Sequence, residues 1–280
     1  MSAQPRRRLD TELVRRGLAP SRAAARAMIA DGRVTVSGAP SSKAARLVAA
    51  GEPVLVAGPG PRYVSRGGEK LAAALEQFGI AVTGTRAIDV GSSTGGFTDC
   101  LLQSGATSVV ALDVGTHQLH EHLRSDPRVE VHERTNVRDV DPGALGAPFA
   151  VLVADLSFIS LTTVAPALRS LLGPGGEAVL LVKPQFEAGR AIVSKGRGVV
   201  TDPDVWADVL ERVGTRFAEL GAAIMGVMRS PLRGADGNVE FLLWLQLPEP
   251  GATIQAQLTP GDLRSAGLAP DDGDPRRPRG

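Results

Sequence analysis

From residue 87 to residue 247 the chain alternates short aliphatic runs with longer segments in which apolar residues recur every three or four positions. The short runs predict strands and the longer segments predict helices. The expected strands are 87–90, 108–112, 129–132, 149–154, 177–182, 223–228 and 239–247, and the expected helices are 97–103, 118–123, 161–172 and 204–220. This alternation predicts an α/β fold with a doubly wound, mostly parallel sheet, whose last two strands are close enough in sequence to pair antiparallel.

A different pattern precedes residue 58. Two short helical segments, near 9–16 and 22–30, are followed by β-rich runs at 33–38 and 53–56, and Ser21 is a good N-cap residue for the second helix. The sequence Gly58-Pro59-Gly60-Pro61 forms a stiff joint. We therefore expect a small α+β domain at 1–57, a linker at 58–66, an α/β domain at 67–247, and a tail at 248–280 that is disordered apart from a short helix allowed near Asp262.

The two regions differ in charge. Residues 1–62 hold eleven basic and four acidic side chains, a net charge of +7, whereas the whole chain carries +1. A concentration of positive charge favours a polyanion as partner. Cys100 is the sole cysteine, and no apolar run approaches the roughly 20 residues that a membrane helix needs. We expect a cytoplasmic protein that binds nucleic acid and no membrane.

The stretch from Ala87 to Asp99 has the form strand, glycine-rich turn, helix. It departs from the G-x-G-x-x-G spacing of dinucleotide-binding loops, because Asp89 precedes the first glycine and Gly95-Gly96 follow later. It resembles instead the S-adenosylmethionine loop of class I methyltransferases, which have a Rossmann-like fold. Functional groups in such folds collect at the carboxyl ends of the strands. The expected cofactor-binding residues are Asp89, Gly91, Ser93, Gly95, Gly96, Phe97, Thr98, Asp113, Asn136 and Asp155.

Asp155 and Lys183 each follow an unbroken apolar strand, Lys70 lies in the first turn of a predicted helix, and Glu240 lies in an apolar run. Together these four residues are similar to the K-D-K-E tetrad of FtsJ-like ribose 2′-O-methyltransferases. A ribose hydroxyl is a very weak acid, so its proton must be drawn away as the oxygen attacks a methyl group. The resemblance implies that Lys183 is the base or the hydroxyl-orienting group. Lys70 and Glu240 would position Lys183 and the ribose, and Asp155 would hold the tetrad and the methyl donor.

Two further groups of residues leave alternatives open. Phe158 lies beside the expected crevice, where it could stack on a flipped base or pack in the core. His117, His120, His122 and His132 are close in sequence but lack zinc-ligand spacing, so we expect no metal site.

The segment that begins Arg8-Leu9-Asp10 and continues through Arg15-Arg16-Gly17-Leu18 is similar to the S4 RNA-binding fold over about residues 7–57. Arg8-Leu9-Asp10 also matches a catalytic triplet of pseudouridine synthases, but here it opens a helix, and we interpret it as packing. The S4 resemblance implies phosphate contacts from arginines on the two helices. The candidates are Arg6, Arg7, Arg15, Arg16, Arg22 and Arg26.

Over about residues 6–247 the chain resembles the TlyA family of ribosomal RNA cytidine-2′-O-methyltransferases, whose older name is haemolysin. The resemblance implies S-adenosylmethionine as cofactor and cytidines in 16S rRNA, 23S rRNA or both as substrates, within ribosomal subunits. Two alternatives are a non-catalytic RNA-binding protein and a membrane-lytic protein; the second is disfavoured because no amphipathic membrane stripe is visible. The sequence specifies neither the modified nucleotide nor the oligomeric state.

Overall fold

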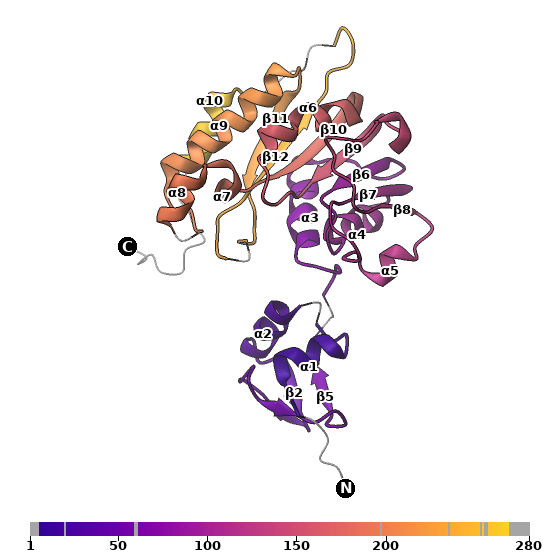
Figure 1. The fold of residues 1–280 in the computed structure, drawn as a ribbon, viewed down its shortest axis with the longest axis vertical. Coiled ribbons are helices and arrows are strands. Elements are labelled where there is room, and N and C mark those ends of the chain that lie inside the picture. The colour runs from indigo at the N-terminus through magenta and orange to yellow at the C-terminus, as the bar shows by residue number, and fades with distance from the viewer. Residues whose placement is uncertain are drawn as a thin grey trace. The chain divides into compact units, whose positions relative to one another are not determined.

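The computed structural model describes residues 6–268 apart from 20, 59–60, 197, 235, 253 and 255–256. The chain divides into two compact units, Met1–Ser65 and Arg66–Gly280, which are described separately below (Figure 1).

The first unit is a small α+β structure. Helices α1 (Leu9–Arg15) and α2 (Arg22–Ala30) accompany a three-stranded antiparallel sheet and a two-stranded sheet. Strands β3 (Ala39–Pro40), β2 (Val34–Val36) and β5 (Val54–Val56) form the first sheet, and β1 (Arg7–Arg8) and β4 (Leu47–Val48) form the second.

The sequence of this unit explains how it folds. Leu9, Leu13, Ile29 and Val34 are fully or almost fully buried in one cluster, which supplies the apolar interior that holds two short helices on short strands. The Ser21 side chain accepts a hydrogen bond from the Ala24 N–H and caps α2, as the sequence predicts.

The second unit is a seven-stranded sheet in the described residues. Its strand order is β11 (Ala223–Arg229), β12 (Phe241–Gln246), β10 (Leu172–Val182), β9 (Phe149–Ala154), β6 (Arg86–Val90), β7 (Ser108–Leu112) and β8 (Val129–His132). The five strands from β10 to β8 are parallel, and β12 is antiparallel to both β10 and β11. The predicted doubly wound sheet is confirmed, and β12 inserts between β10 and β11.

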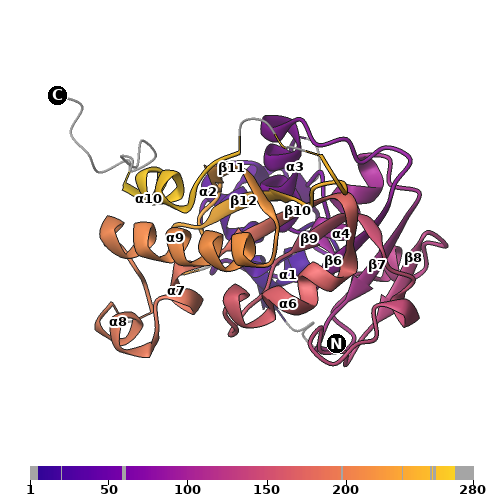
Figure 2. The same cartoon turned by 90° about the horizontal axis from the view of Figure 1, so that it is seen from above.

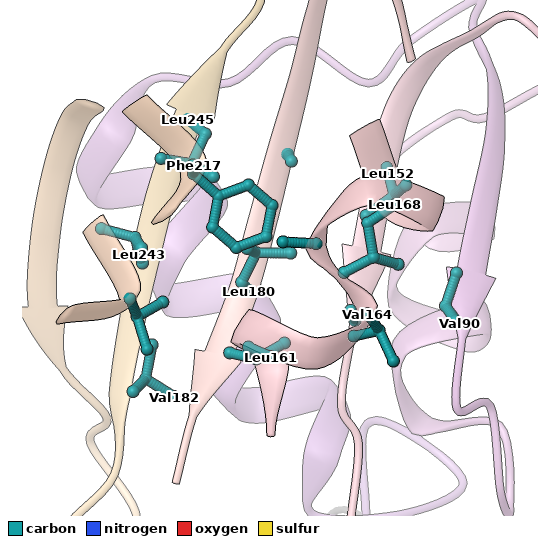
Figure 3. Close-up of a cluster of buried hydrophobic side chains, with 14 of the residues drawn as sticks. Val90, Leu152, Leu161, Val164, Leu168, Leu180, Val182, Phe217, Leu243 and Leu245 are labelled. Atoms are coloured by element: carbon teal, nitrogen blue, oxygen red, sulfur yellow. The ribbon is translucent and has the colours of Figure 1, made fainter. Parts of the chain in front are cut away.

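Helices cover both faces of this sheet. Helices α3 (Gly67–Phe78) and α4 (Gly96–Gln103) lie on one face, and α6 (Leu161–Leu171) and α9 (Pro203–Glu219) lie on the other (Figure 2). Leu180, Leu168 and Phe217 meet in the core between the sheet and the second pair of helices (Figure 3). Shorter helices occur in the connections: α5 (Glu121–Arg124), the 3-10 turn Gly143–Leu145, α7 (Pro184–Glu187) and α8 (Arg190–Lys195).

The region predicted to be a disordered tail contains the helix α10 (Pro260–Leu268), which includes Asp262. This helix packs on α9, with Leu263 fully buried. A Cβ atom at Gly267 would lie 2.6 Å from the Ala207 Cα, so the two helices approach closely. The short helix that the sequence allows near Asp262 is therefore present over residues 260–268, where Leu263 and Gly267 dock it on α9. Residues 269–280 lie outside the described part of the chain.

No helix among the described residues is long and apolar enough to cross a membrane.

Candidate active site and nucleic-acid interface

A cavity of about 470 Å³ opens at the carboxyl ends of β6, β7 and β9, the edge of the sheet where ligands bind in open α/β folds. Val90 and Leu112 are the last residues of β6 and β7, and Asp155 directly follows β9. Of the expected cofactor-binding residues, the cavity is lined by Gly91, Ser93, Asp113, Asn136 and Asp155. Further lining residues were not predicted as ligands from the sequence; they include Val114, Gly115, Gln118, Thr135, Val137, Leu156 and Ile159.

Gly91 lets the chain pass close to the loop after β9. Its φ is +86°, and a Cβ atom there would lie 2.5 Å from the carbonyl oxygen of Asp155. Both observations require glycine. Gly95 has a φ of +94° and a different role, because its Cβ position would overlap the Leu123 side chain rather than face the cavity.

Asp113 holds both sides of the cavity in place. One carboxylate oxygen accepts the Ser93 N–H at 2.8 Å, and the other accepts the Gly115 N–H at 2.6 Å. Asp113 thereby connects the glycine turn to the loop after β7. Asn136 lies on the lining after β8, and its side-chain oxygen accepts the Arg138 N–H at 3.1 Å.

Five of the expected cofactor-binding residues do not line the cavity: Asp89, Gly95, Gly96, Phe97 and Thr98. All five are buried. Asp89 is fully buried and accepts a hydrogen bond from the Thr98 hydroxyl at 2.6 Å. Burial raises the pKa of Asp89 to about 7, while the Thr98 hydrogen bond opposes the shift and the nearby charge of Asp155 adds to it. These residues support the turn from within.

The four residues of the expected tetrad form two ion pairs. Lys183 Nζ lies 2.5 Å from Asp155 Oδ1 and donates to the Ser157 hydroxyl at 3.1 Å. Lys70 Nζ pairs with Glu240 Oε2, and both of these side chains are buried. Lys70 lies in the first turn of α3, where the helix dipole disfavours a cation, and Glu240 supplies the compensating charge.

The sheet register relates the two pairs to each other. Val182 is paired with Phe241 across the antiparallel strands β10 and β12. Lys183, directly after β10, and Glu240, directly before β12, therefore lie at the same end of the sheet. On the other side of β10, Leu180 is paired with Ala154, the residue before Asp155. Three tetrad residues therefore lie at the ends of three adjacent strands, and α3, which carries Lys70, packs on β12.

The loops after β9 and β10 are joined by contacts that sequence reasoning missed. The Glu187 carboxylate accepts from the Ser160 hydroxyl at 2.5 Å and from the Leu161 N–H at 2.6 Å. Burial raises the pKa of Glu187 above its usual value. The Phe158 and Phe186 rings lie 5.0 Å apart between centroids. These hydrogen bonds join residues 26 or 27 positions apart, and such a separation leaves no periodic signal in the sequence. The one available signal is that both segments follow adjacent strands.

Phe158 is exposed, which excludes the core-packing alternative. Its side chain is 91% exposed, on the lining of the cavity, and its φ of +64° is strained for a non-glycine residue. Such an exposed ring beside a cavity is available to stack on a ligand.

In the first unit the candidate arginines fall into different settings. Arg6 and Arg7 are exposed. Arg15 and Arg16 both pair with Glu12, and Arg22 and Arg26 both pair with Asp10. Arg16 also donates to the carbonyl oxygens of Ala49, Ala50 and Glu52, and its side chain is only 18% exposed. These bonds make Arg16 a structural residue, contrary to its expected phosphate contact.

Arg8 departs from the packing role expected of it. Its side chain is 44% exposed and makes a two-pronged contact with Asp10, with Nε at 3.0 Å and the second nitrogen at 3.2 Å. The other two residues of Arg8-Leu9-Asp10 are both fully buried, in keeping with the packing interpretation.

No group of three or more metal-ligating side chains occurs among the described residues.

Comparison with known proteins identifies the family. The model of the FtsJ-like methyltransferase matches residues 63–247, and that of the S4 domain matches residues 7–54. The chain belongs to the FtsJ-like methyltransferases. A relative in Mycobacterium tuberculosis, named 16S/23S rRNA (cytidine-2′-O)-methyltransferase TlyA, is 51% identical over 242 residues, which cover 86% of this chain and 90% of the relative. This similarity assigns the chain to the TlyA family within the FtsJ-like methyltransferases.

Other members of this FtsJ-like group carry a different name. A protein of Brachyspira hyodysenteriae called Hemolysin A is 39% identical, over 84% of this chain and 98% of that protein. A solved structure from Streptococcus thermophilus with a hemolysin name is 37% identical, covers 95% of each chain and has a TM-score of 0.72.

Proposed function

We propose that this protein transfers a methyl group from S-adenosylmethionine to the 2′-hydroxyl of a cytidine in ribosomal RNA. The observation that carries the proposal is the Lys183–Asp155 ion pair, because Asp155 also lines the cavity. A proton-handling group therefore lies beside a ligand-sized space. We infer the substrate from the 51% identical relative, which is named as an rRNA cytidine-2′-O-methyltransferase.

The residues around the cavity fit S-adenosylmethionine. Asp113 presents a fixed carboxylate to accept the ribose hydroxyls, as an acid about 20 residues past a glycine turn does in related folds. Leu112, Val137 and Ile159 supply apolar walls for an adenine ring, and Gly91 permits close approach of the backbone. When bound, S-adenosylmethionine supplies an electrophilic methyl group on a positively charged sulfur.

Side chains of this protein would orient the ribose 2′-hydroxyl and remove its proton. Lys183 Nζ orients the ribose 2′-hydroxyl. As the oxygen attacks the methyl carbon, the hydroxyl proton moves to Nζ while Nζ passes one of its own protons to the Asp155 carboxylate beside it. Asp155 fixes Lys183 Nζ at 2.5 Å, and the Lys70–Glu240 pair lies at the end of the adjoining strand, where it positions the ribose. Alignment of oxygen and methyl carbon contributes alongside proton transfer, because fixed geometry removes much of the entropic barrier.

RNA recognition would be divided between the two units. The S4 unit offers exposed arginines for phosphate contacts. At the catalytic cavity the exposed Phe158 ring would stack on the base of the target nucleotide once it leaves the RNA stack. An rRNA substrate is in keeping with the cytoplasmic location expected from the sequence; whole ribosomal subunits are the expected form of that substrate.

The decisive experiment replaces Lys183. Transfer of tritiated methyl groups from S-adenosylmethionine to unmodified 30S and 50S subunits would be measured with the wild-type chain, Lys183→Ala and Lys183→Arg. Both variants should lose roughly a thousandfold or more in rate, since a general base contributes about two to four powers of ten and its alignment more. Lys183→Arg tests the proton step, because arginine keeps the positive charge beside Asp155 but does not accept a proton. Near-normal transfer by either variant would reject the assignment.

Two binding measurements accompany the rates. Titration with S-adenosylmethionine and with ribosomal subunits should give the wild-type affinities for both variants, which shows that the fold is intact. A wild-type chain that binds subunits but neither binds S-adenosylmethionine nor transfers methyl groups would favour the non-catalytic RNA-binding alternative.

A further inference from the structure

Three arginines of the S4 unit converge on one buried carboxylate. Arg8 contacts Asp10 through two nitrogens, Arg22 donates at 3.1 Å, and Arg26 donates through Nε at 3.1 Å. The Asp10 side chain is fully buried, whereas the arginine side chains are 44%, 53% and 56% exposed in that order. We call the three arginines that share Asp10, namely Arg8, Arg22 and Arg26, the arginine trident.

The geometry of the arginine trident leaves its outer side available. A guanidinium carries five N–H donors, and among the described contacts Arg22 and Arg26 each give one to Asp10. Arg22 and Arg26 are four residues apart on α2 and so share one face of that helix, while Arg8 comes from β1. The cluster keeps two net positive charges after Asp10 is counted. A buried acid thus gathers exposed cations that would otherwise repel each other.

The neighbouring acid on the same helix does something different. Glu12 is also buried and also pairs with two arginines. One of them, Arg16, is directed inward by three backbone carbonyls of the segment 49–52. The Glu12 cluster therefore connects α1 to that segment, whereas the Asp10 cluster presents its cations to solvent.

We propose that Asp10 is a positioning residue for RNA binding, which holds Arg8, Arg22 and Arg26 as one preorganised site for the phosphates of the RNA backbone. The identity of the ligand rests on the proposed function, which makes RNA the substrate. The physical reason is preorganisation: an arginine loses rotamer freedom when it binds, and a side chain already fixed loses less. Planar guanidiniums held in place also match phosphate oxygens in two-pronged contacts.

Asp10→Asn separates this role from simple electrostatics. Removing a negative charge from an RNA-binding face should tighten RNA binding if charge alone matters. If Asp10 positions the arginine trident, binding should weaken by roughly tenfold, and the slope of log K against log salt should become shallower by about one to two, as one to two phosphate contacts are lost. The probe is a deproteinised 23S rRNA transcript, titrated with the full chain at several salt concentrations without S-adenosylmethionine.

The matched control is Asp31→Asn. Asp31 is an exposed acid at the end of α2, so the same chemical change there should leave RNA binding unchanged or slightly tighter. Hydrogen exchange of α1 and α2 checks that Asp10→Asn keeps the S4 unit folded. Unchanged or tighter binding by folded Asp10→Asn, or weaker binding with the wild-type salt slope, would overturn the proposal.

Arg26→Gln covers the case in which Asp10→Asn does not fold. It leaves Arg8 and Arg22 on Asp10, and it should weaken binding and lower the salt slope by about one. A wild-type slope for Arg26→Gln would also overturn the proposal. The readout is binding without turnover. If the wild-type chain binds RNA with a salt slope but transfers no methyl group, the proposed function fails while the role of Asp10 stands.

Discussion

The two units of this chain bury acidic side chains in opposite electrostatic settings. In the S4 unit, hydrogen bonds from Arg8 hold the pKa of Asp10 well below its usual range, and hydrogen bonds from Arg15 lower the pKa of Glu12 to about 2. In the methyltransferase unit, burial raises the pKa of Asp89 to about 7 and also raises that of Glu187. Asp89 and Glu187 accept from hydroxyl and backbone groups, whereas Asp10 and Glu12 accept from guanidiniums. Guanidinium partners lower the pKa of Asp10 and Glu12, whereas burial without such a partner raises the pKa of Asp89 and Glu187.

This contrast gives the two units opposite responses to pH. The stabilisation from Glu12 is complete above the pKa of the unfolded side chain, 4.5, and is lost as the pH falls toward about 2. Asp89 has the opposite effect on stability. Between pH 3.8, the pKa of the unfolded side chain, and about pH 7, the folded state holds a proton that the unfolded state has released. Acidification from pH 7 to pH 4 should therefore stabilise the methyltransferase unit at Asp89 and leave Glu12 still ionised.

The largest effect on stability should come from the Lys70–Glu240 pair. Here a buried acid of the methyltransferase unit is paired with a buried cation. Glu240→Ala leaves the Lys70 ammonium buried without its partner and should reduce the free energy of unfolding by about 3–5 kcal/mol. In the S4 unit, Arg26→Ala removes a half-exposed partner and should cost about 1 kcal/mol or less. Urea unfolding of Glu240→Ala, followed by tryptophan fluorescence, measures the first value, because Trp206 and Trp244 both lie in the methyltransferase unit. Hydrogen exchange of α2 measures the second.

A double variant distinguishes stability from function at this pair. Lys70→Met with Glu240→Leu removes both charges and should recover most of the lost stability, since apolar replacements of a buried ion pair are often neutral or better. Methyl transfer should remain absent. A Glu240→Ala variant as stable as the wild-type chain would show that the pair is open to water.

The next effect concerns Asp89. A shift from 3.8 to about 7 in a fully buried group corresponds to about 3 kcal/mol of stability lost as the pH rises from 4 to 7. Asp89→Asn keeps an acceptor for the Thr98 hydroxyl but does not titrate, so this part of the pH dependence should disappear. Urea titrations at pH 4.5, 6 and 7.5 with tryptophan detection would measure it. Equal pH dependence in the variant and the wild-type chain would contradict the role given to Asp89.

The same contrast explains what the sequence could and could not predict. The sheet was predictable, because buried parallel strands leave continuous apolar runs and the following residues, Asp155 and Lys183, mark their ends. The inward direction of Arg16 was not, since its carbonyl partners are 33 to 36 residues away. Likewise, Asp89 was expected to bind cofactor because motif position does not reveal whether a side chain faces the cavity or the core. Periodicity identifies faces, while individual partners depend on tertiary packing.

The smallest effect should come from Glu187, the acid that connects the loops carrying Asp155 and Lys183. Glu187→Gln is nearly isosteric and weakens at least one of the two hydrogen bonds. A hydrogen bond of this kind contributes about 0.5–1.5 kcal/mol. If the loops lose their alignment, the rate constant should fall by roughly two- to tenfold. The KM for S-adenosylmethionine should not change, because Glu187 does not line the cavity. Since its pKa is raised, acidification should neutralise Glu187 earlier than an ordinary glutamate. The wild-type kcat should then approach that of Glu187→Gln as the pH falls, whereas a constant ratio across the pH range would mean that the carboxylate charge does not hold the loops together.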